Sequence, residues 1–404
     1  MIIHHHAAYV MAYLSIIDSH RITNQHRQHL NAAGRRLNQA KITAGALPSS
    51  DVSPFQIWFE KGTDQDFRCM TGLDRQAFLD ILALFEPLFD AYHINRKTGA
   101  IELVELTIHG KKKGRPREIS AAGCLCLVLL WYRTTGALSR THQFFLGSSR
   151  TPLSDWLRFG KRVLLSVLQA HPDAMIMPPT DEEIDQYCAA VVAKFPHAVD
   201  IWGAADGVKL SIQGSGDINE QNMFYNGWYH GTFHNSIFVF APDGRIRLCC
   251  FNSPGCWHDS WQADMGNVYH KLEDIYLRTG KKVVIDSAFK LHNAPFLIKS
   301  AQTDPYGAGP LLQNRAATSV RQLSEWGMRM IEAQFPRLGK EALRYETTGE
   351  RKCTINLMIL LYNFATKRVG INQILNTYMP EQSGEFKYYY DGPMIPPTAD
   401  HLFE

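Results

Sequence analysis

The chain has 404 residues, of which 45% are hydrophobic and 20% are charged, and its formal net charge is +3. This length and hydrophobic content allow a large buried core and two or three domains, as in a soluble enzyme. The small net charge excludes a general positive field around the protein. Any contact with nucleic acid must therefore come from local clusters of basic residues.

The cysteines and the apolar runs indicate the compartment. The eight cysteines include no Cys-x-x-Cys pair, and several lie in apolar runs, which predicts buried free thiols in a reducing compartment. The apolar stretch 121–130 is too short to cross a bilayer, and the amino terminus lacks a basic-then-apolar signal pattern. We therefore expect a soluble, intracellular protein without a membrane partner, nuclear if the source is a eukaryote.

Residues 1–53 are polar and rich in His, Asn, Gln and Arg, which predicts a flexible or marginally helical tail. Residues 54–178 are expected to be helical, because apolar residues between Phe78 and Leu88 recur with helical spacing. A dense basic segment interrupts this region and contains Lys111, Lys112, Lys113, Arg115 and Arg117. Three interpretations remain open for it: a solvated linker, a nuclear-import signal, or a contact with the DNA minor groove.

Three further helices are expected between the basic segment and residue 178. Ser120 is the expected cap of a helix that ends at Arg133, and a short helix covers 138–145. The third starts with Thr151 as cap and Pro152 in its first turn, and continues to about residue 168. Three helices with tight turns are typical of a helix-turn-helix, or alternatively of a small bundle packed on the rest of the protein. The third helix carries four candidate phosphate contacts, Arg150, Arg158, Lys161 and Arg162.

The second half of the chain alternates between strand and helix patterns. After a connector at 179–197, strands are expected around Asp206, at 237–240, at 246–251 and at 283–285, with a helix after Asp259. The turn Pro242-Asp243-Gly244 is expected to join the strands at 237–240 and 246–251. This order predicts a mixed sheet flanked by helices over 198–371, followed by a tail at 372–404. Aromatic residues interleaved with histidines at 225–234 are either a DNA-facing patch or part of the core.

Three acidic residues stand at positions suited to metal binding. Asp206 and Asp286 are expected at the ends of strands, and Glu325 on a later helix. A side chain at a strand end is fixed on the rim of the sheet, and carboxylate oxygens suit Mg²⁺ or Mn²⁺. Taken singly, the three acids are also explained as a turn residue, a cap and a solvated helix position.

The segments around these acids resemble one family over residues 205–371. The resemblance rests on the sequences at 206–207, 225–228, 240–244, 253–260, 284–289, 321–328 and 361–364, which include Ser-Pro-Gly-Cys-Trp-His-Asp-Ser and Arg-Gln-Leu-Ser-Glu-Trp-Gly-Met. Together they resemble the Harbinger-type DDE superfamily of transposases and their domesticated nuclease relatives. The resemblance implies a ribonuclease H-like fold, preceded by a helix-turn-helix-like domain.

The resemblance also implies roles for individual residues. Asp206, Asp286 and Glu325 match the three catalytic acids of the family, and Asp259 matches a fourth acid that often binds metal. Asp259 is alternatively a helix cap. His258 is either a site residue or a packed side chain. Arg321 shares a helix face with Glu325, where it either orients the acid or forms a surface ion pair.

The family implies a metal-dependent DNA endonuclease and strand transferase that acts through two metal ions. Its partners would be double-stranded DNA at transposon ends and target sites, a Myb-like DNA-binding protein, and further copies of the chain. The alternative from another functional class is a non-catalytic DNA-binding adaptor on the same scaffold. A ribonuclease H is disfavoured, because the helical amino-terminal half and the Ser-Glu-Trp-Gly motif point away from it.

Overall fold

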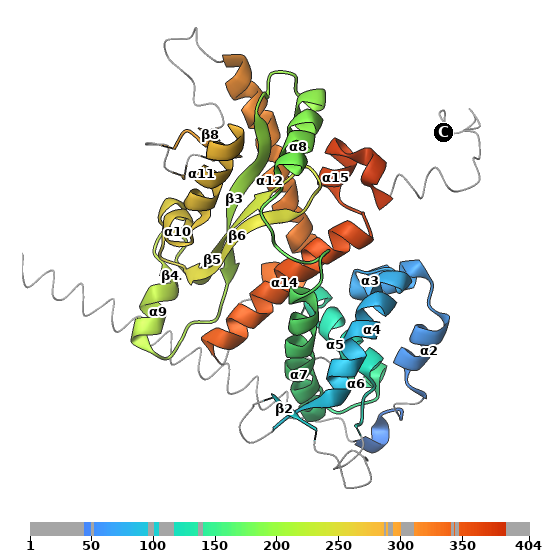
Figure 1. The fold of residues 1–404 in the computed structure, drawn as a ribbon. Coiled ribbons are helices and arrows are strands. Elements are labelled where there is room, and N and C mark those ends of the chain that lie inside the picture. The colour runs from blue at the N-terminus through green and yellow to red at the C-terminus, as the bar shows by residue number, and fades with distance from the viewer. Residues whose placement is uncertain are drawn as a thin grey trace, which may run out of the picture.

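The computed structural model describes residues 44–49, 52–95, 101–104, 117–135, 140–286, 288–289, 294–299, 311–340, 343 and 347–384 (Figure 1). Both expected tails lie largely outside these residues. Four members of the basic segment also lie outside them, Lys111, Lys112, Lys113 and Arg115. Their predicted contact with DNA therefore stays a prediction.

The amino-terminal half is helical. After a short 3-10 turn, η1 (Ala44–Ala46), the helices are α2 (Pro54–Lys61), α3 (Asp64–Thr71), α4 (Arg75–Ala91), α5 (Ala121–Arg133), α6 (Arg140–Leu146) and α7 (Arg150–Gln169). A small hairpin of β1 (Tyr92–Ile94) and β2 (Ile101–Leu103), which the sequence did not predict, follows α4.

The helix boundaries follow local signals in the sequence. The Ser120 hydroxyl accepts a hydrogen bond from the Gly123 N–H and caps the start of α5. The helix then ends at Arg133, as predicted. Gly147 has a φ of +64° at the end of α6, a backbone conformation that glycine adopts most easily. Helix α7 begins one residue before the expected cap, at Arg150, with Ser149 in the N-cap position.

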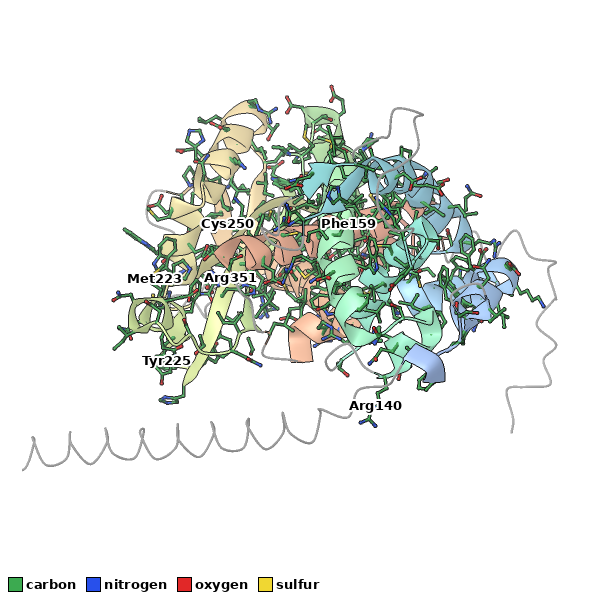
Figure 2. All side chains as sticks on the ribbon, turned by 90° about the horizontal axis from the view of Figure 1, so that it is seen from below. Arg140, Phe159, Met223, Tyr225, Cys250 and Arg351 are labelled. Atoms are coloured by element: carbon green, nitrogen blue, oxygen red, sulfur yellow. The ribbon has the colours of Figure 1, made fainter. Side chains whose placement is uncertain are left out.

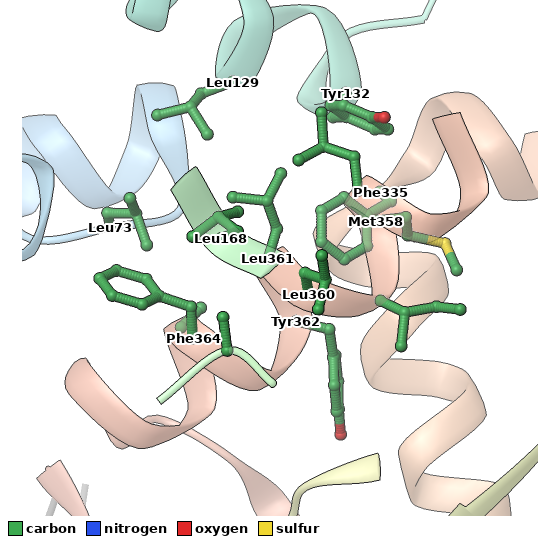
Figure 3. Packing of buried hydrophobic residues seen from close by; sticks show 14 of the residues in the cluster. Leu73, Leu129, Tyr132, Leu168, Phe335, Met358, Leu360, Leu361, Tyr362 and Phe364 are labelled. Carbon is green, nitrogen blue, oxygen red and sulfur yellow. The ribbon is translucent and has the colours of Figure 1, made fainter. Parts of the chain in front are cut away.

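The two halves of the chain share one hydrophobic core. Helix α14 (Thr348–Arg368) packs against α7 on one side and against the sheet strand β6 (Ile246–Pro254) on the other. Its residues Leu361 and Phe364 belong to the same buried cluster as Leu129 and Leu168 of the amino-terminal helices (Figure 3). The amino-terminal helices thus pack directly on the rest of the protein, and whether they bind DNA as a helix-turn-helix stays a prediction.

The carboxy-terminal half contains a mixed six-stranded sheet, as predicted. Strand β3 (Ile201–Ser211) lies at its centre, antiparallel to β5 (Gly231–Phe240) and parallel to β7 (Lys282–Ile285). Strand β8 (Leu297–Lys299) extends the parallel side, and β4 (Tyr225–Asn226) and β6 both pair with β5. The hairpin of β5 and β6 is the one that the turn at 242–244 predicted.

Helices cover both faces of this sheet. Helix α12 (Leu311–Gln334) and α14 pack on one face, where they share a core with Ala204 and Phe240. Helices α8 (Asp181–Lys194), α10 (Asp259–Met265) and α11 (Val268–Thr279) pack on the other face. The short helix α9 (Ile218–Phe224) lies at the edge of the molecule (Figure 1), and α13 (Pro336–Lys340) packs against α5, α12 and β3. None of the helices described here is long and apolar enough to span a membrane.

The folded part extends beyond the expected boundary at residue 371. Helix α15 (Gln373–Tyr378) and the 3-10 turn η3 (Pro380–Gln382) follow it. The buried Asn372 side chain caps α15 and donates hydrogen bonds to the hydroxyls of Tyr362 and Thr366, each at 3.1 Å. These bonds attach the segment to α14, so residues 372–384 belong to the core rather than to a tail.

Gly327 sets how closely α12 approaches the sheet. A Cβ atom at this position would lie 2.5 Å from the Phe240 ring of β5. Gly327→Ala should therefore destabilise the fold by about 1–2 kcal/mol, because overpacking outweighs the gain in helix propensity. The measurement is the free energy of unfolding in urea.

The exposed helical glycine Gly349 provides the control, because a Cβ there would meet only the Thr347 hydroxyl, at 3.8 Å. Gly349→Ala should be neutral or stabilise the protein by up to about 1 kcal/mol. Equal effects of the two substitutions would show that Gly327 does not limit the packing of α12.

Candidate active site

Two of the predicted acids lie at the same level of neighbouring parallel strands. The pairing of β3 with β7 ends at Ala204 and Val284, and Asp206 and Asp286 each stand two residues further along. Asp286 directly follows its strand, as predicted. Asp206 does not end its strand, because β3 continues to Ser211 with β5 as its partner. The strand that ends next to Asp206 is its neighbour, β7.

Both acids belong to the face of the sheet that α12 covers. Ala204 and Leu210 pack in the core between the sheet and α12, and so does Val284 of β7. Because side chains alternate along a strand, Asp206 shares the face of Ala204 and Leu210, and Asp286 shares the face of Val284. The parallel pairing and this alternation together bring the two carboxylates to one place.

The third acid, Glu325, lies on α12, the helix that covers the same face of the sheet. Glu325 forms an ion pair with Arg321, one helical turn earlier, and both side chains are half-buried. The predicted pairing along the helix face is therefore present. Burial raises the pKa of Asp206 and the Arg321 charge lowers it, so this guanidinium acts electrostatically on the sheet carboxylates.

The environment of Asp206 disfavours its charged form. Burial raises its pKa to about 6, and a hydrogen bond from the Gly207 N–H to Oδ1 at 2.7 Å acts in the opposite direction. The charges of Asp286 and, to a smaller extent, Asp259 raise the pKa further. Asp286 in turn accepts a hydrogen bond from the Ala288 N–H at 2.8 Å. Each carboxylate is thus oriented by a backbone group, while the two carboxylates repel each other.

Asp259 lies across β3 from Asp206. It is the first residue of α10, and the N-cap position belongs to His258, so the interpretation of Asp259 as a cap was wrong. The Asp259 carboxylate lies against Gly207, where a Cβ atom would come within 3.0 Å of it, and its Oδ1 lies 3.4 Å from the Lys209 Nζ. By alternation, Gly207 and Lys209 face away from Asp206.

His258 is exposed and makes no capping hydrogen bond through its side chain. Lys209 is a candidate site residue that the sequence analysis did not identify. Its position three residues after Asp206 on the same strand was visible, but its partner Asp259 lies 50 residues away in the chain. Only the approach of α10 to β3 brings the two charges together.

The four carboxylates are ligands that suit a hard cation, but they do not form a complete metal site in this structure. Among the described residues, no group of three or more His, Cys, Asp or Glu side chains lies close enough together to hold a metal ion. Two of the four acids are matched by protein cations, Glu325 by Arg321 and Asp259 by Lys209. The repulsion between Asp206 and Asp286 is the feature that a divalent cation would relieve.

Two of the candidate DNA contacts, Arg117 and Lys161, contact other parts of the protein. The Arg117 guanidinium donates to the Phe89 and Tyr92 carbonyls and lies 4.3 Å from the centroid of the Phe89 ring. Lys161 is buried, with Nζ 3.3 Å from the Trp131 ring centroid. The helical pattern could not distinguish this inward position from the outer face of α7. Lys161 is therefore not accessible to a phosphate, whereas Arg117 is only half-buried and its predicted contact with DNA stays a prediction.

The other candidates on α7 have a different environment. Arg158 is half-buried and Arg162 is exposed. Arg150 begins the helix, and its side chain lies outside the described part. The predicted phosphate contacts of these three residues therefore stay predictions.

The comparisons with known proteins bear on the same segment. Residues 205–363 match the family model described as DDE superfamily endonuclease. No curated protein and no solved structure matches the chain. The matched segment contains all four acids and supports a nuclease domain similar to those of DDE transposases. It does not distinguish the Harbinger type.

The buried position of Lys161 has a measurable consequence for stability. Burial lowers the pKa of Lys161 to about 7, from an ordinary value of 10.5. Between these values the unfolded chain binds more protons than the folded protein, so stability should rise with pH by up to about 1.4 kcal/mol per pH unit. Lys161→Met should remove this rise in a series of urea titrations.

The matched control is Lys352→Met, which changes an exposed lysine on α14. This variant should keep the pH dependence of the wild type. Identical pH profiles for Lys161→Met and the wild type would show that the Lys161 ammonium is solvated and would restore it as a candidate for phosphate contact.

Proposed function

We propose that the chain is a metal-dependent DNA endonuclease and strand transferase of the Harbinger transposase type. The observation that carries the proposal is the placement of Asp206 and Asp286 at one level of two parallel strands, with Glu325 on the helix that covers the same face. Carboxylates in such an arrangement suit the hydrolysis and transfer of phosphodiesters. The match of residues 205–363 to the DDE superfamily endonuclease model supports it.

Asp206, Asp286 and Glu325 would hold Mg²⁺ or Mn²⁺ in this proposal. Bound metal would activate the attacking hydroxyl and stabilise the leaving oxyanion. Arg321 would have two roles: its ion pair would orient Glu325 on α12, and its charge would act on Asp206. An arginine in this position also suits contact with a DNA phosphate.

Asp259 would serve the site through Lys209. Because Asp259 lies across the strand from Asp206, we assign it the ordering of Lys209 and of the strand edge. Lys209 would then meet the DNA backbone next to the reacting phosphodiester. His258 stands beside Asp259 on the exposed side, where it would support the same contact.

The reaction would proceed in two displacements at phosphorus. Water first replaces the 3′ oxygen of one DNA segment and frees a 3′-hydroxyl at the transposon end. That hydroxyl then attacks a target phosphodiester, so one P–O bond forms as another breaks. Double-stranded DNA is therefore the proposed substrate, with Arg150, Arg158 and Arg162 of α7 as proposed backbone contacts. A Myb-like partner, self-association and a nuclear location are further parts of the proposal.

The acid cluster makes a direct prediction for catalysis. Asp286→Asn and Glu325→Gln should each lower Mg²⁺- or Mn²⁺-dependent cleavage of supercoiled plasmid by about 100-fold or more, because each removes a negative ligand from the cation. Nicking and linearisation on a gel measure the rate. Addition of a chelator should abolish the cleavage by the wild type.

Glu332→Gln is the matched control, since Glu332 is an exposed acid on the same helix, α12. It should cleave like the wild type. The wild type could also bind DNA without cleaving it with either metal, alone or with a Myb-like partner. That result would favour the alternative function, a non-catalytic DNA-binding adaptor.

The pairing of Asp259 with Lys209 makes a second prediction. Asp259→Asn and Lys209→Met should each reduce cleavage by roughly 10-fold, as residues that orient a site do. The double variant should lose little more than either single variant, because both remove the same interaction. A double-mutant cycle of cleavage rates measures this coupling. Independent, multiplicative losses would show that Asp259 acts without Lys209.

A further inference from the structure

Hydrogen bonds hold the backbone of two aromatic residues in the turn between β4 and β5. The Asn226 Oδ1 accepts hydrogen bonds from the backbone N–H groups of Trp228, at 3.1 Å, and Tyr229, at 3.2 Å. The Asn226 Nδ2 donates to the Gly255 carbonyl at 2.7 Å. One asparagine thus shapes the turn and attaches it to the segment that leads into His258 and Asp259.

A second amide strengthens this attachment. The Asn235 Nδ2 of β5 donates to the Trp257 carbonyl at 3.0 Å and reaches the Gly255 carbonyl at 3.4 Å. Gly255 itself fits tightly, because a Cβ atom there would lie 2.1 Å from the Phe233 carbonyl oxygen. The turn and the segment before Asp259 are therefore one connected unit.

The aromatic side chains of this turn point into solvent. The exposed fraction is 87% for Trp228 and 58% for Tyr229. Tyr225 of β4 and Met223 of α9 are also exposed, and Figure 2 shows both at the outer edge of the molecule. Large apolar side chains grouped on a surface indicate a binding site, and here the backbone beneath them is held by hydrogen bonds.

Lys209 connects these aromatics with the acid site. Its Nζ lies 5.5 Å from the centroid of the Tyr229 ring and 3.4 Å from the Asp259 Oδ1. Lys209 stands three residues from Asp206 on β3. A DNA strand whose phosphate contacts Lys209 would therefore bring its neighbouring bases to the aromatic turn.

The side chains of the turn indicate which kind of ligand would bind there. Two aromatic faces beside an ammonium group suit a flat ring attached to a phosphate, which describes a nucleotide. Bases inside a duplex are already stacked on their neighbours, so the available ring belongs to an unpaired nucleotide. We propose that Trp228 and Tyr229 stack on an unpaired nucleobase of the DNA strand held at the acid site, an inference that rests on the proposed function.

The test compares two DNA ligands in the absence of metal, so that binding is separated from cleavage. One is a fluorescently labelled blunt duplex, and the other is the same duplex with a single-stranded extension. Fluorescence anisotropy gives both dissociation constants. The wild type should prefer the extended DNA, and Trp228→Ala should weaken that binding by about ten-fold or more while leaving the blunt duplex unchanged.

Two further variants make the result specific. Trp228→Phe should retain most of the preference, because a phenyl ring still stacks. Phe144→Ala removes an exposed aromatic side chain from α6, in the helical half, and should bind both ligands like the wild type. Since Trp228 is almost fully exposed, its replacement should leave the far-UV circular dichroism unchanged.

The outcomes separate this inference from the proposed function. If Trp228→Ala binds both DNAs like the wild type, or loses affinity for both equally, the stacking proposal is overturned, and a protein partner becomes the better occupant. If the wild type binds extended DNA through Trp228 but never cleaves DNA with Mg²⁺ or Mn²⁺, the stacking proposal holds and the endonuclease proposal fails. If the wild type binds neither DNA, the stacking proposal is overturned.

Discussion

The parallel pairing of β3 with β7 is the constraint on which the candidate site depends. It fixes the register at Ala204 and Val284 and then ends, so Asp206 and Asp286 follow at the same level on the same face. No side-chain contact is needed to bring these acids together, because backbone hydrogen bonds and the alternation of side chains determine their positions. A shift of one residue in β7 would turn Asp286 to the other face and separate the pair.

Charge compensation then determines how four acids coexist around one strand. Carboxylates gathered in a half-buried place repel each other, and the protein offsets part of this with Arg321 on the α12 face and Lys209 on the α10 face. Gly207 makes the second arrangement possible, because a side chain there would occupy the space of the Asp259 carboxylate. Asp206 and Asp286 are left as the pair with the strongest need for a further cation.

The sequence predicted the features that depend on local patterns and failed where distant segments meet. The Ser120 cap, the turn at 242–244 and the apolar strand before Asp286 are local, and the structure confirms each. Asp206 was predicted at the end of a strand, but it lies within β3. Its position at the edge of the parallel pairing is set by the end of β7, and no residue of β3 indicates this. Lys161 was assigned to DNA because helical spacing alone does not reveal that α7 packs against both α5 and α14. The pairing of Lys209 with Asp259 likewise required α10 to lie on the sheet.

The shared core has a consequence for how DNA binding and cleavage would be related. Helix α14 packs on α7 and on the sheet, and the Tyr132 hydroxyl of α5 donates to the Thr354 carbonyl of α14 at 2.7 Å. Removal of the amino-terminal helices would expose an apolar face of α14, so the matched segment 205–363 is not expected to fold by itself. Because rigid packing joins the two halves, DNA bound on the outer side of α7 would hold a constant orientation relative to Asp206 and Asp286. Selection of a cleavage site by such a protein would then follow from the geometry of the fold rather than from movement between two domains.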